Sequence, residues 1–295
     1  MQTFNYTKED VLSSFRTKVS KIYDEVKHKK DPTKHLNNGI KKVALELIDP
    51  LIENLELTNN QKLDKILLVH YCMYIVMIEF RNRISPYEYM AFTRRIGELW
   101  EPFCKLCWTF TSEEGIAVTI PPTFDEAKIH LSRNLNNFIG TLNLSTEQKT
   151  ELDTYLELIW ELVSSGGIKL KSDLHFEKNG VKYNVDFKSG FNSNEKGNTN
   201  RLLMVGSIFK KLDPAYENII LVRAEEKDNN HYLQTLKNSD QWNVFCGQET
   251  YDKIEELTGF PLKVWIRTNI DWKNDLDKDT IDYLTNAKLD QYLSW

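Results

Sequence analysis

The sequence predicts an α/β protein, in an α+β arrangement in which a largely helical half precedes a mixed sheet. Apolar residues in the first half of the 295-residue chain recur at helical spacing. In the second half, Asn179-Gly180 separates two stretches of alternating polarity, and the nearly all-apolar run 218–222 follows one further helical segment. The antiparallel hairpin and the strand that follows the helical segment, which is expected to be parallel to its neighbour, must therefore share one sheet. We expect a helical region over residues 1–140 and a sheet-containing core with a C-terminal helix over 141–295.

Capping residues and apolar spacing define the helices of the first region. Thr7 precedes two acidic residues, as at a helix N-terminus, and Ser85-Pro86 combines a capping residue with a proline suited to the first helical position. A short strand is expected over 116–120. The helices expected in this region are 7–26, 41–57, 60–83, 85–100 and 123–138.

The second region opens with a capping box. Ser145 stands three residues before Gln148, and an apolar stripe at helical spacing follows. Gly259 suits the end of a helix over 249–257. Further helices are expected at 200–212, 232–236 and 277–293, and strands at 218–222, 242–246 and 262–266.

The turn fixes the register of the hairpin. A two-residue type I′ turn at Asn179-Gly180 makes Asp173 face Asp186. Because side chains alternate along a strand, one face of the hairpin collects the apolar residues and becomes the core face. The opposite face, which we expect to point outward, carries the two acids, with Lys188 two residues beyond the second.

The two opposed carboxylates predict a bound cation. Directly opposite residues of a hairpin have Cβ atoms ~5 Å apart, so like charges there are destabilising unless a cation lies between them. Mg²⁺ is usually held by one or two carboxylates together with phosphate oxygens, and Lys188 would then lie near a bound water and the phosphate. The alternative is that Asp173, Asp186 and Lys188 are solvated charges on an exposed strand face.

Composition predicts a cytoplasmic protein with an anionic partner. The formal net charge is −5 at pH 7, but residues 166–201 contain seven Lys or Arg against four Asp or Glu, a local balance of +3 that suits a polyanion. Four cysteines in a chain of this length indicate a reducing compartment. We expect neither secretion nor membrane insertion, because the start lacks an apolar signal region and the longest uncharged run, 66–78, is short.

These features together resemble the core of the PD-(D/E)XK nucleases, and within that superfamily the type II restriction endonucleases. The resemblance rests on a helix carrying an acid, a strand ending Ser172-Asp173, the sequence Val185-Asp186-Phe187-Lys188 on the next strand, and a following helix and buried strand. It covers residues 146–266. The helical region matches no pattern of the family, and Ser172 stands where the family often has proline.

The resemblance assigns roles to particular residues. Asp173 and Asp186 would bind catalytic Mg²⁺, and Lys188 would orient the attacking water or help to deprotonate it. Glu157 on the preceding helix would be an auxiliary acid, with Glu161 as its substitute, although helix glutamates are usually solvated. Such a site suits phosphodiester hydrolysis, because the metal lowers the pKa of water and a positioned cation stabilises charge on the phosphate.

The polar run after Lys188 resembles the segment with which such enzymes approach DNA. Asparagine pairs with adenine and arginine with guanine in the major groove, and lysine contacts phosphates. A flexible polar surface loop would have the same composition. The candidate DNA-binding residues are Asn192, Asn194, Lys196, Asn198, Asn200 and Arg201.

The first hypothesis is therefore a Mg²⁺-dependent, site-specific endonuclease of double-stranded DNA, the hydrolase of a prokaryotic restriction-modification system. Cleavage of both strands at a palindrome would imply a homodimer, and the helical region would serve DNA contact or dimerisation. One alternative is a structure-specific, repair or RNA nuclease on the same core, and another is a catalytically inactive DNA-binding module. The recognition sequence and the position of the cut do not follow from these residues.

Overall fold

A computed structural model describes residues 6–163, 169–192 and 195–295, except for the side chains of residue 157 and residues 159–163. The protein is a mixed α+β protein that divides into two compact units. One unit comprises Met1–Glu114 and Tyr251–Trp295 and is called here the helical unit. The other, Gly115–Thr250, contains the strands and is called the sheet unit.

The unit boundaries differ from the predicted division at residue 140 because the C-terminal segment returns to the first helices. The indole Nε1 of Trp265 donates to Asp64 Oδ1 over 2.7 Å, and the ring of Trp272 meets that of Tyr71 edge-on at 5.1 Å. These contacts join residues about two hundred positions apart. The chain from Gly115 through α5 and α6 belongs instead with the strands.

The helical unit is organised around α3 (Asn59–Ile84), which is buried along most of its length between Leu63 and Phe80. In the described part of the chain, no helix combines the length and apolar character required to cross a membrane. The carboxylate of Glu79 is fully buried and accepts from Arg16 Nε at 3.1 Å and from the backbone N–H of Asp277 at 2.8 Å. The other helices are α1 (Lys8–Val26), α2 (Pro32–Glu53), α4 (Tyr89–Thr109), α9 (Gln248–Thr258, which begins at the unit boundary), α10 (Leu262–Asn269), α11 (Trp272–Asp275) and α12 (Lys278–Asn286).

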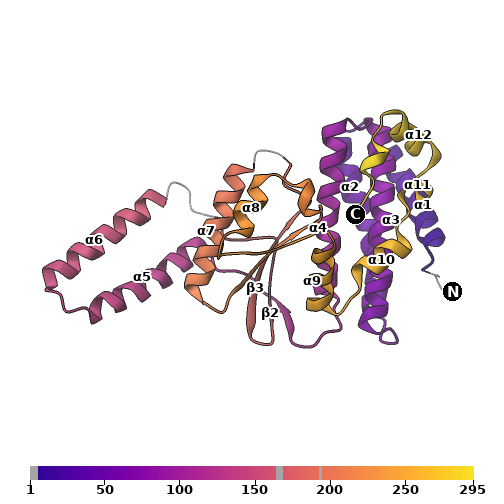
Figure 1. The fold of residues 1–295 in the computed structure, drawn as a ribbon. Coiled ribbons are helices and arrows are strands. Elements are labelled where there is room, and N and C mark those ends of the chain that lie inside the picture. The colour runs from indigo at the N-terminus through magenta and orange to yellow at the C-terminus, as the bar shows by residue number, and fades with distance from the viewer. Residues whose placement is uncertain (1–5, 164–168, 193–194) are drawn as a thin grey trace. The chain divides into compact units, whose positions relative to one another are not determined.

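The described strands of the sheet unit form one five-stranded mixed sheet in the order β1-β2-β3-β4-β5 (Figure 1). The pairs β1–β2 and β2–β3 are antiparallel, whereas β3–β4 and β4–β5 are parallel, so the predicted mixed sheet is confirmed. The strands are β1 (Ile116–Val118), β2 (Leu174–Lys178), β3 (Val181–Lys188), β4 (Glu217–Val222) and β5 (Asn243–Cys246). The helices are α5 (Phe124–Thr141), α6 (Thr146–Val163), α7 (Lys196–Leu212) and α8 (His231–Lys237).

Local signals confirm the hairpin and the capping box. Asn179 and Gly180 have φ values of 52° and 82°, as a type I′ turn requires, and the observed register pairs Leu174 with Val185. At the start of α6, Gln148 N donates to the Ser145 hydroxyl over 3.2 Å, and Ser145 N donates back to Gln148 Oε1 over 2.9 Å. Both signals were readable because they depend on residues two or three positions apart.

Residues 262–266 do not form the predicted strand; they lie in helix α10, which follows Pro261. The buried side chains of this segment are Leu262, Trp265 and Ile266, whose i, i+3, i+4 spacing is that of a helix face. The short apolar run alone did not distinguish this pattern from a strand.

Several predicted helix ends also differ. Helix α4 begins at Tyr89 rather than at Ser85, because Ser85 instead caps the C-terminus of α3 and the N–H of Tyr87 donates to Asn82 Oδ1 over 3.0 Å. Helix α2 begins at 32 rather than 41, and α12 ends at 286 rather than 293. Helix α7 begins at 196 rather than 200, which places part of the expected polar loop in a helix.

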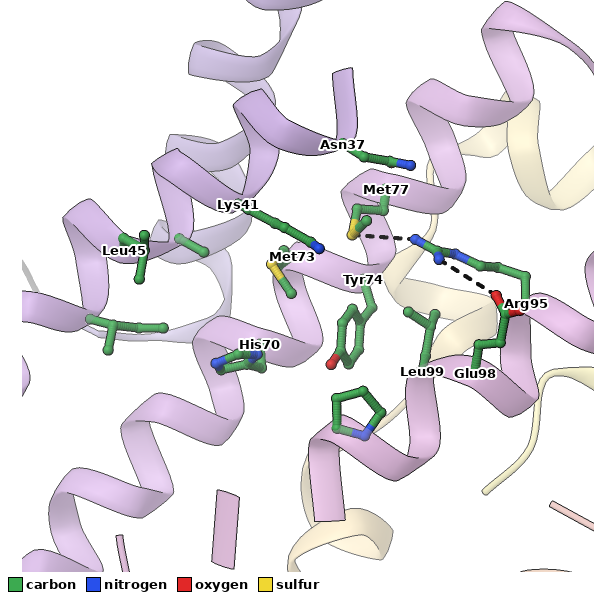
Figure 2. Close-up of a pocket in the computed structure, with 13 residues that line it drawn as sticks. Asn37, Lys41, Leu45, His70, Met73, Tyr74, Met77, Arg95, Glu98 and Leu99 are labelled. Carbon is green, nitrogen blue, oxygen red and sulfur yellow. Dashed lines mark hydrogen bonds and ion pairs between the residues drawn. The ribbon is translucent and has the colours of Figure 1, made fainter. Parts of the chain in front are cut away.

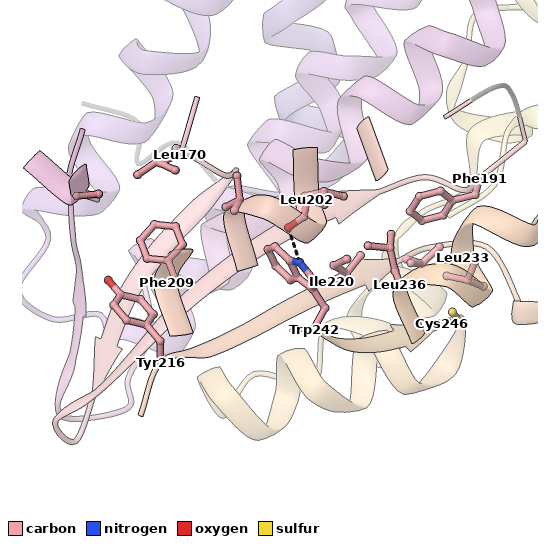
Figure 3. Packing of buried hydrophobic residues seen from close by; sticks show 13 residues of the cluster. Leu170, Phe191, Leu202, Phe209, Tyr216, Ile220, Leu233, Leu236, Trp242 and Cys246 are labelled. Atoms are coloured by element: carbon pink, nitrogen blue, oxygen red, sulfur yellow. Dashed lines mark hydrogen bonds between the residues drawn. The ribbon is translucent and has the colours of Figure 1, made fainter. Parts of the chain in front are cut away.

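The core of the sheet unit lies between the sheet and α7 with α8 (Figure 3). Leu202 and Phe209 from α7 and Leu236 from α8 pack with Ile220 of β4. The indole of Trp242 donates to the backbone carbonyl of Leu202 over 2.7 Å. This layer of helices covers the face of the hairpin that carries Asp186.

Candidate metal and nucleic-acid site

The acid-bearing face of the hairpin is buried, which corrects the expectation that it points outward. Asp186 and His175 are only 1% and 3% exposed, and Asn184 is fully buried. Helix α7 lies over this face, with the rings of His175 and Phe209 5.4 Å apart. Strand β3 lies between β2 and β4, and its residues 184–187 are buried on both faces of the sheet.

The structure brings Asp173 to the strand that carries Asp186. Asp173 directly precedes β2, and its Oδ2 accepts from the backbone N–H of Phe187 over 2.8 Å. The carboxylate of Asp173 therefore bends toward β3 just beyond Asp186. The nearby negative charge of Asp173 helps to raise the pKa of Asp186. The two predicted metal ligands thus lie in one cluster, as the register implies.

Two cations neutralise Asp186. The ammonium group of Lys188, two residues further along β3, forms an ion pair with Oδ1, and Arg201 Nη2 lies 3.3 Å from Oδ2. The side chains of Lys188 and Arg201 are 20% and 28% exposed, so both reach the cluster from its solvent side. Arg201 Nη1 also donates to the backbone carbonyl of Lys169 over 3.3 Å. We call Asp173, Asp186, Lys188 and Arg201 the acid–cation cluster.

Burial dominates the acid–base behaviour of Asp186. Loss of hydration raises the pKa of this carboxyl, and the charge of Lys188 opposes the shift by favouring the ionised form. A buried carboxylate needs a cation close by, because isolated charges are costly away from water. In the structure Lys188 and Arg201 supply that charge, and a metal ion could supply it instead.

The donor set fits Mg²⁺. Two carboxylates are the usual protein contribution to a Mg²⁺ site, with water and phosphate oxygens completing the shell. Asp186 Oδ1 is buried and, apart from its ion pair with Lys188, makes no hydrogen bond of ordinary geometry. Within the described residues, no group of three or more His, Cys, Asp or Glu side chains forms a cage for a metal. An ion here would therefore depend on Asp173, Asp186 and non-protein oxygens.

Three predicted site residues lie wholly or partly outside the described part of the molecule. Glu157 lies on helix α6, but its side chain and that of Glu161 are outside the described residues. Asn194 also lies outside them. Their predicted roles, as auxiliary acids and as a DNA contact, stay predictions.

The remaining predicted DNA-binding residues lie at or near the start of α7. Asn192 is exposed before the helix, and Lys196 and Asn200 are exposed on its first turns. Asn198 is turned inward: its Nδ2 donates to Glu195 Oε2 over 3.3 Å, and its Oδ1 accepts from Arg201 Nε over 3.4 Å. These two bonds connect the exposed start of α7 to the acid–cation cluster.

The sequence predicted Arg201 as a DNA contact but did not predict its ion pair with Asp186 or the polar residues near the cluster. Helix α7 was expected to begin at 200 with Arg201 pointing outward; because the helix begins at 196, Arg201 is its sixth residue. Asn184 Nδ2 donates to Asn218 Oδ1 over 2.9 Å, and Asn218 Nδ2 donates to the carbonyls of Gly206 and Gln241. The sequence did hold one indication of a buried polar role for Asn218, because this asparagine stands at the start of an otherwise apolar strand.

His175 has a structural position. Its Nε2 accepts from the backbone N–H of Ser172 over 3.1 Å, and its Nδ1 is buried without a hydrogen-bond partner among the described residues. Burial lowers the pKa of His175 to about 4, with a smaller contribution from the charge of Lys171. The neutral imidazole therefore holds the turn before β2, next to Asp173.

Comparison of the chain with protein-family models, with curated protein sequences and with solved structures found no match.

Proposed function

We propose that the protein is a Mg²⁺-dependent endonuclease that hydrolyses phosphodiester bonds of double-stranded DNA at a specific site. One observation carries the proposal: Asp173, Asp186 and Lys188 converge beside a helix whose first turns expose Lys196 and Asn200. Paired acids, a lysine on the same strand and an adjacent polar helix start meet the needs of metal-assisted phosphoryl chemistry. The resemblance to PD-(D/E)XK nucleases, and to type II restriction enzymes in particular, supports the same class.

In this proposal Asp173 and Asp186 would hold Mg²⁺. The bound ion would lower the pKa of water and offset charge on the scissile phosphate. Lys188 leaves Oδ1 of Asp186 and contacts the attacking water or a phosphate oxygen, where its positive charge stabilises the developing negative charge. Arg201 either keeps Asp186 in place or moves to a phosphate oxygen, and its planar group suits both carboxylate and phosphate.

DNA would approach the start of α7. Lys196 would contact a phosphate, and Asn192 and Asn200 are exposed for contacts with base edges. A homodimer would give the twofold symmetry needed to cut both strands of a palindromic site. A sedimentation-velocity measurement with and without duplex DNA would establish the number of copies.

The second candidate function is binding of DNA without cleavage. It is favoured by the ion pairs of Lys188 and Arg201 with Asp186, which occupy both carboxylate oxygens that a metal would need. In a binding module these pairs would be permanent. In a nuclease, Mg²⁺ and DNA together would break at least one of them.

Digestion of unmodified phage DNA with the purified protein, in Mg²⁺ or in EDTA, tests the proposal. We expect discrete fragments that require Mg²⁺, and Asp186→Asn and Lys188→Ala should each lower the cleavage rate by at least about a hundredfold. Asp213→Asn is the matched control, because that acid pairs with Lys182 away from the cluster. Circular dichroism of each variant would show that the fold is retained.

The other outcomes identify the alternatives. Nicks or a smear would indicate a structure-specific or nonspecific nuclease, and cleavage of RNA alone would indicate a ribonuclease. Binding of duplex DNA without cleavage of DNA, RNA or branched substrates would favour the binding module. Full activity of Asp186→Asn would contradict the assignment of the site.

A further inference from the structure

A second site lies in the helical unit, where α2, α3 and α4 enclose a pocket of about 510 Å³ (Figure 2). Its volume lies within the range of small-molecule sites, roughly 300–1,000 Å³. The walls are mainly apolar, and Met73, Met77 and Leu99 are among the buried residues that line it. The pocket is separate from the acid–cation cluster, because all of its lining residues belong to the helical unit.

Of the three charged residues that line the pocket, Lys41 and Arg95 are positive and Glu98 is negative. Lys41 from α2 and Arg95 from α4 both line it, and no hydrogen bond or ion pair engages the ammonium of Lys41 among the residues that the structure describes. Arg95 Nη2 contacts the thioether of Met77 at 3.6 Å, and Nη1 lies 4.0 Å from Glu98 Oε2. A thioether is a weak acceptor, and Glu98 already accepts from Arg94 Nε over 2.7 Å. The guanidinium of Arg95 is therefore incompletely neutralised.

A polar group on α3 also lacks a partner. His70 lines the same pocket, and its Nδ1 is buried with no hydrogen-bond partner in the described parts of the chain. The ring of His70 meets that of Tyr74 edge-on at 6.2 Å. Buried polar groups without partners are uncommon, so Nδ1 offers a hydrogen-bonding position at the wall of the pocket.

We propose that this pocket binds a small amphipathic acid. Its carboxylate contacts Arg95 and Lys41, and its apolar body lies between Met73, Met77 and Leu99. The planar fork of arginine matches a carboxylate, and methionine side chains adapt to apolar bodies of varied shape. A cationic ligand is disfavoured by the two positive groups. With an apolar ligand, the nearest acid to Arg95 among the described ion pairs would be Glu98, 4.0 Å away and already paired with Arg94.

Methyl NMR can test the proposal directly, because the chain has five methionines and two of them line the pocket. Full-length protein carrying ¹³C-methyl methionine is titrated with decanoate, up to about 1 mM. We expect saturable shifts of the Met73 and Met77 signals. Met90 and Met204, which are 72% and 43% exposed, report nonspecific binding and should not move. Met73→Leu and Met77→Leu assign the signals.

Charge variants on the same helices provide a matched comparison. Lys41→Gln combined with Arg95→Gln should weaken decanoate binding by at least about tenfold, since a charge-assisted contact is lost. Lys42→Gln combined with Lys105→Gln removes two other charges of α2 and α4 that do not line the pocket, since Lys105 pairs with Glu101, and should leave the affinity within about twofold. Decanol, which has the same chain without the charge, should bind at least about tenfold more weakly than decanoate.

Three results would overturn the proposal. The first is the absence of Met73 and Met77 shifts over the whole titration. The second is equal binding of decanoate and decanol, which would indicate an apolar void without preference for an acid. The third is equal affinity in the two double variants, which would show that Lys41 and Arg95 do not recognise the ligand.

Discussion

At the residue scale, burial of the β2–β3 face changes how His175 and Asp186 carry charge. Both side chains are almost inaccessible to water, so the neutral form is favoured in each. Burial lowers the pKa of His175 to about 4, and the nearby charge of Asp173 opposes this shift only in part. Asp186 has Lys188 and Arg201 beside it, which support its ionised form despite a raised pKa. Asp186 and His175 therefore differ in charge because of their neighbours and not because of their burial.

The pKa of His175 predicts a loss of stability in mild acid. The folded-state value of about 4 lies below the ordinary 6.5, so between these two values the unfolded chain binds the proton more readily. The stabilising contribution is fully present above pH 6.5 and decreases as the pH falls toward 4, by up to about 3 kcal/mol. Urea unfolding at pH 7 and at pH 4.5 would measure this loss.

The variant His175→Gln separates this contribution from that of His70. Burial also lowers the pKa of His70 to about 4, so the two histidines act in the same direction. The glutamine oxygen can still accept from the backbone N–H of Ser172 but cannot take up a proton. We expect a smaller stability difference between the two pH values in this variant. An unchanged difference would show that His175 is not the titrating group.

At the element scale, helix α7 determines the environment of the acid–cation cluster. It brings Arg201 to Asp186, and the carbonyl of Gly206 accepts from Asn218 Nδ2 over 3.1 Å. Its close approach to the sheet depends on Gly206, because an added Cβ there would lie 2.5 Å from Trp242 Nε1 and 3.0 Å from the Cβ of Gln241. A shift of α7 away from the sheet would therefore break the close contact between the helix and the indole of Trp242.

Two glycine substitutions in α7 should have opposite effects. Gly206→Ala forces a clash with Trp242 and should lower the free energy of unfolding by about 1–3 kcal/mol. Gly197→Ala meets no atom within 4 Å and should raise it by up to about 1 kcal/mol, because alanine favours the helix. Chemical denaturation of both variants would check this pair. Equal effects would show that α7 does not depend on close contact at Gly206.

The same helix shows what could be predicted from the sequence and what could not. The hairpin turn, its register and the capping box at Ser145 were readable because each depends on neighbours in the chain. The register also predicted that Asp173 and Asp186 meet. Burial of the hairpin face that carries these two acids could not be predicted from the sequence, because it depends on α7 packing across the sheet. The α10 segment was misassigned for a related reason, since its helical face is defined by distant partners such as Asp64.

At the scale of the whole molecule, the two ends of the chain form one helical unit, so its stability depends on contacts that span the sequence. Trp272 is a clear case. It is 4% exposed and meets the rings of Tyr71 and Trp295 edge-on at 5.1 Å each. Tyr71 in turn donates from its hydroxyl to Asp275 Oδ2 over 2.7 Å. Helix α3 is thus held by residues that follow it by about two hundred positions.

Removal of the Trp272 indole should therefore weaken α3. Trp272→Ala leaves a cavity beside Tyr71 and should lower the free energy of unfolding by about 3–5 kcal/mol. Hydrogen exchange should show faster exchange of the α3 amides between Leu63 and Phe80. Trp272→Phe should cost much less, because it keeps a ring beside Tyr71 and removes an indole N–H that is buried without a partner in the described structure.

Lys273→Ala is the neighbouring control, since its 63% exposed side chain makes only a surface ion pair with Asp290 and should change stability by at most about 1 kcal/mol. If Trp272→Ala left the exchange of α3 unchanged while the C-terminal helices became labile, the first helices would form a core of their own. The expected result, loss of protection in both places at once, would mean that the first helices and the C-terminal segment unfold as one cooperative unit. Its contact order is then high, and folding of this unit should be slow relative to a helical bundle with local contacts.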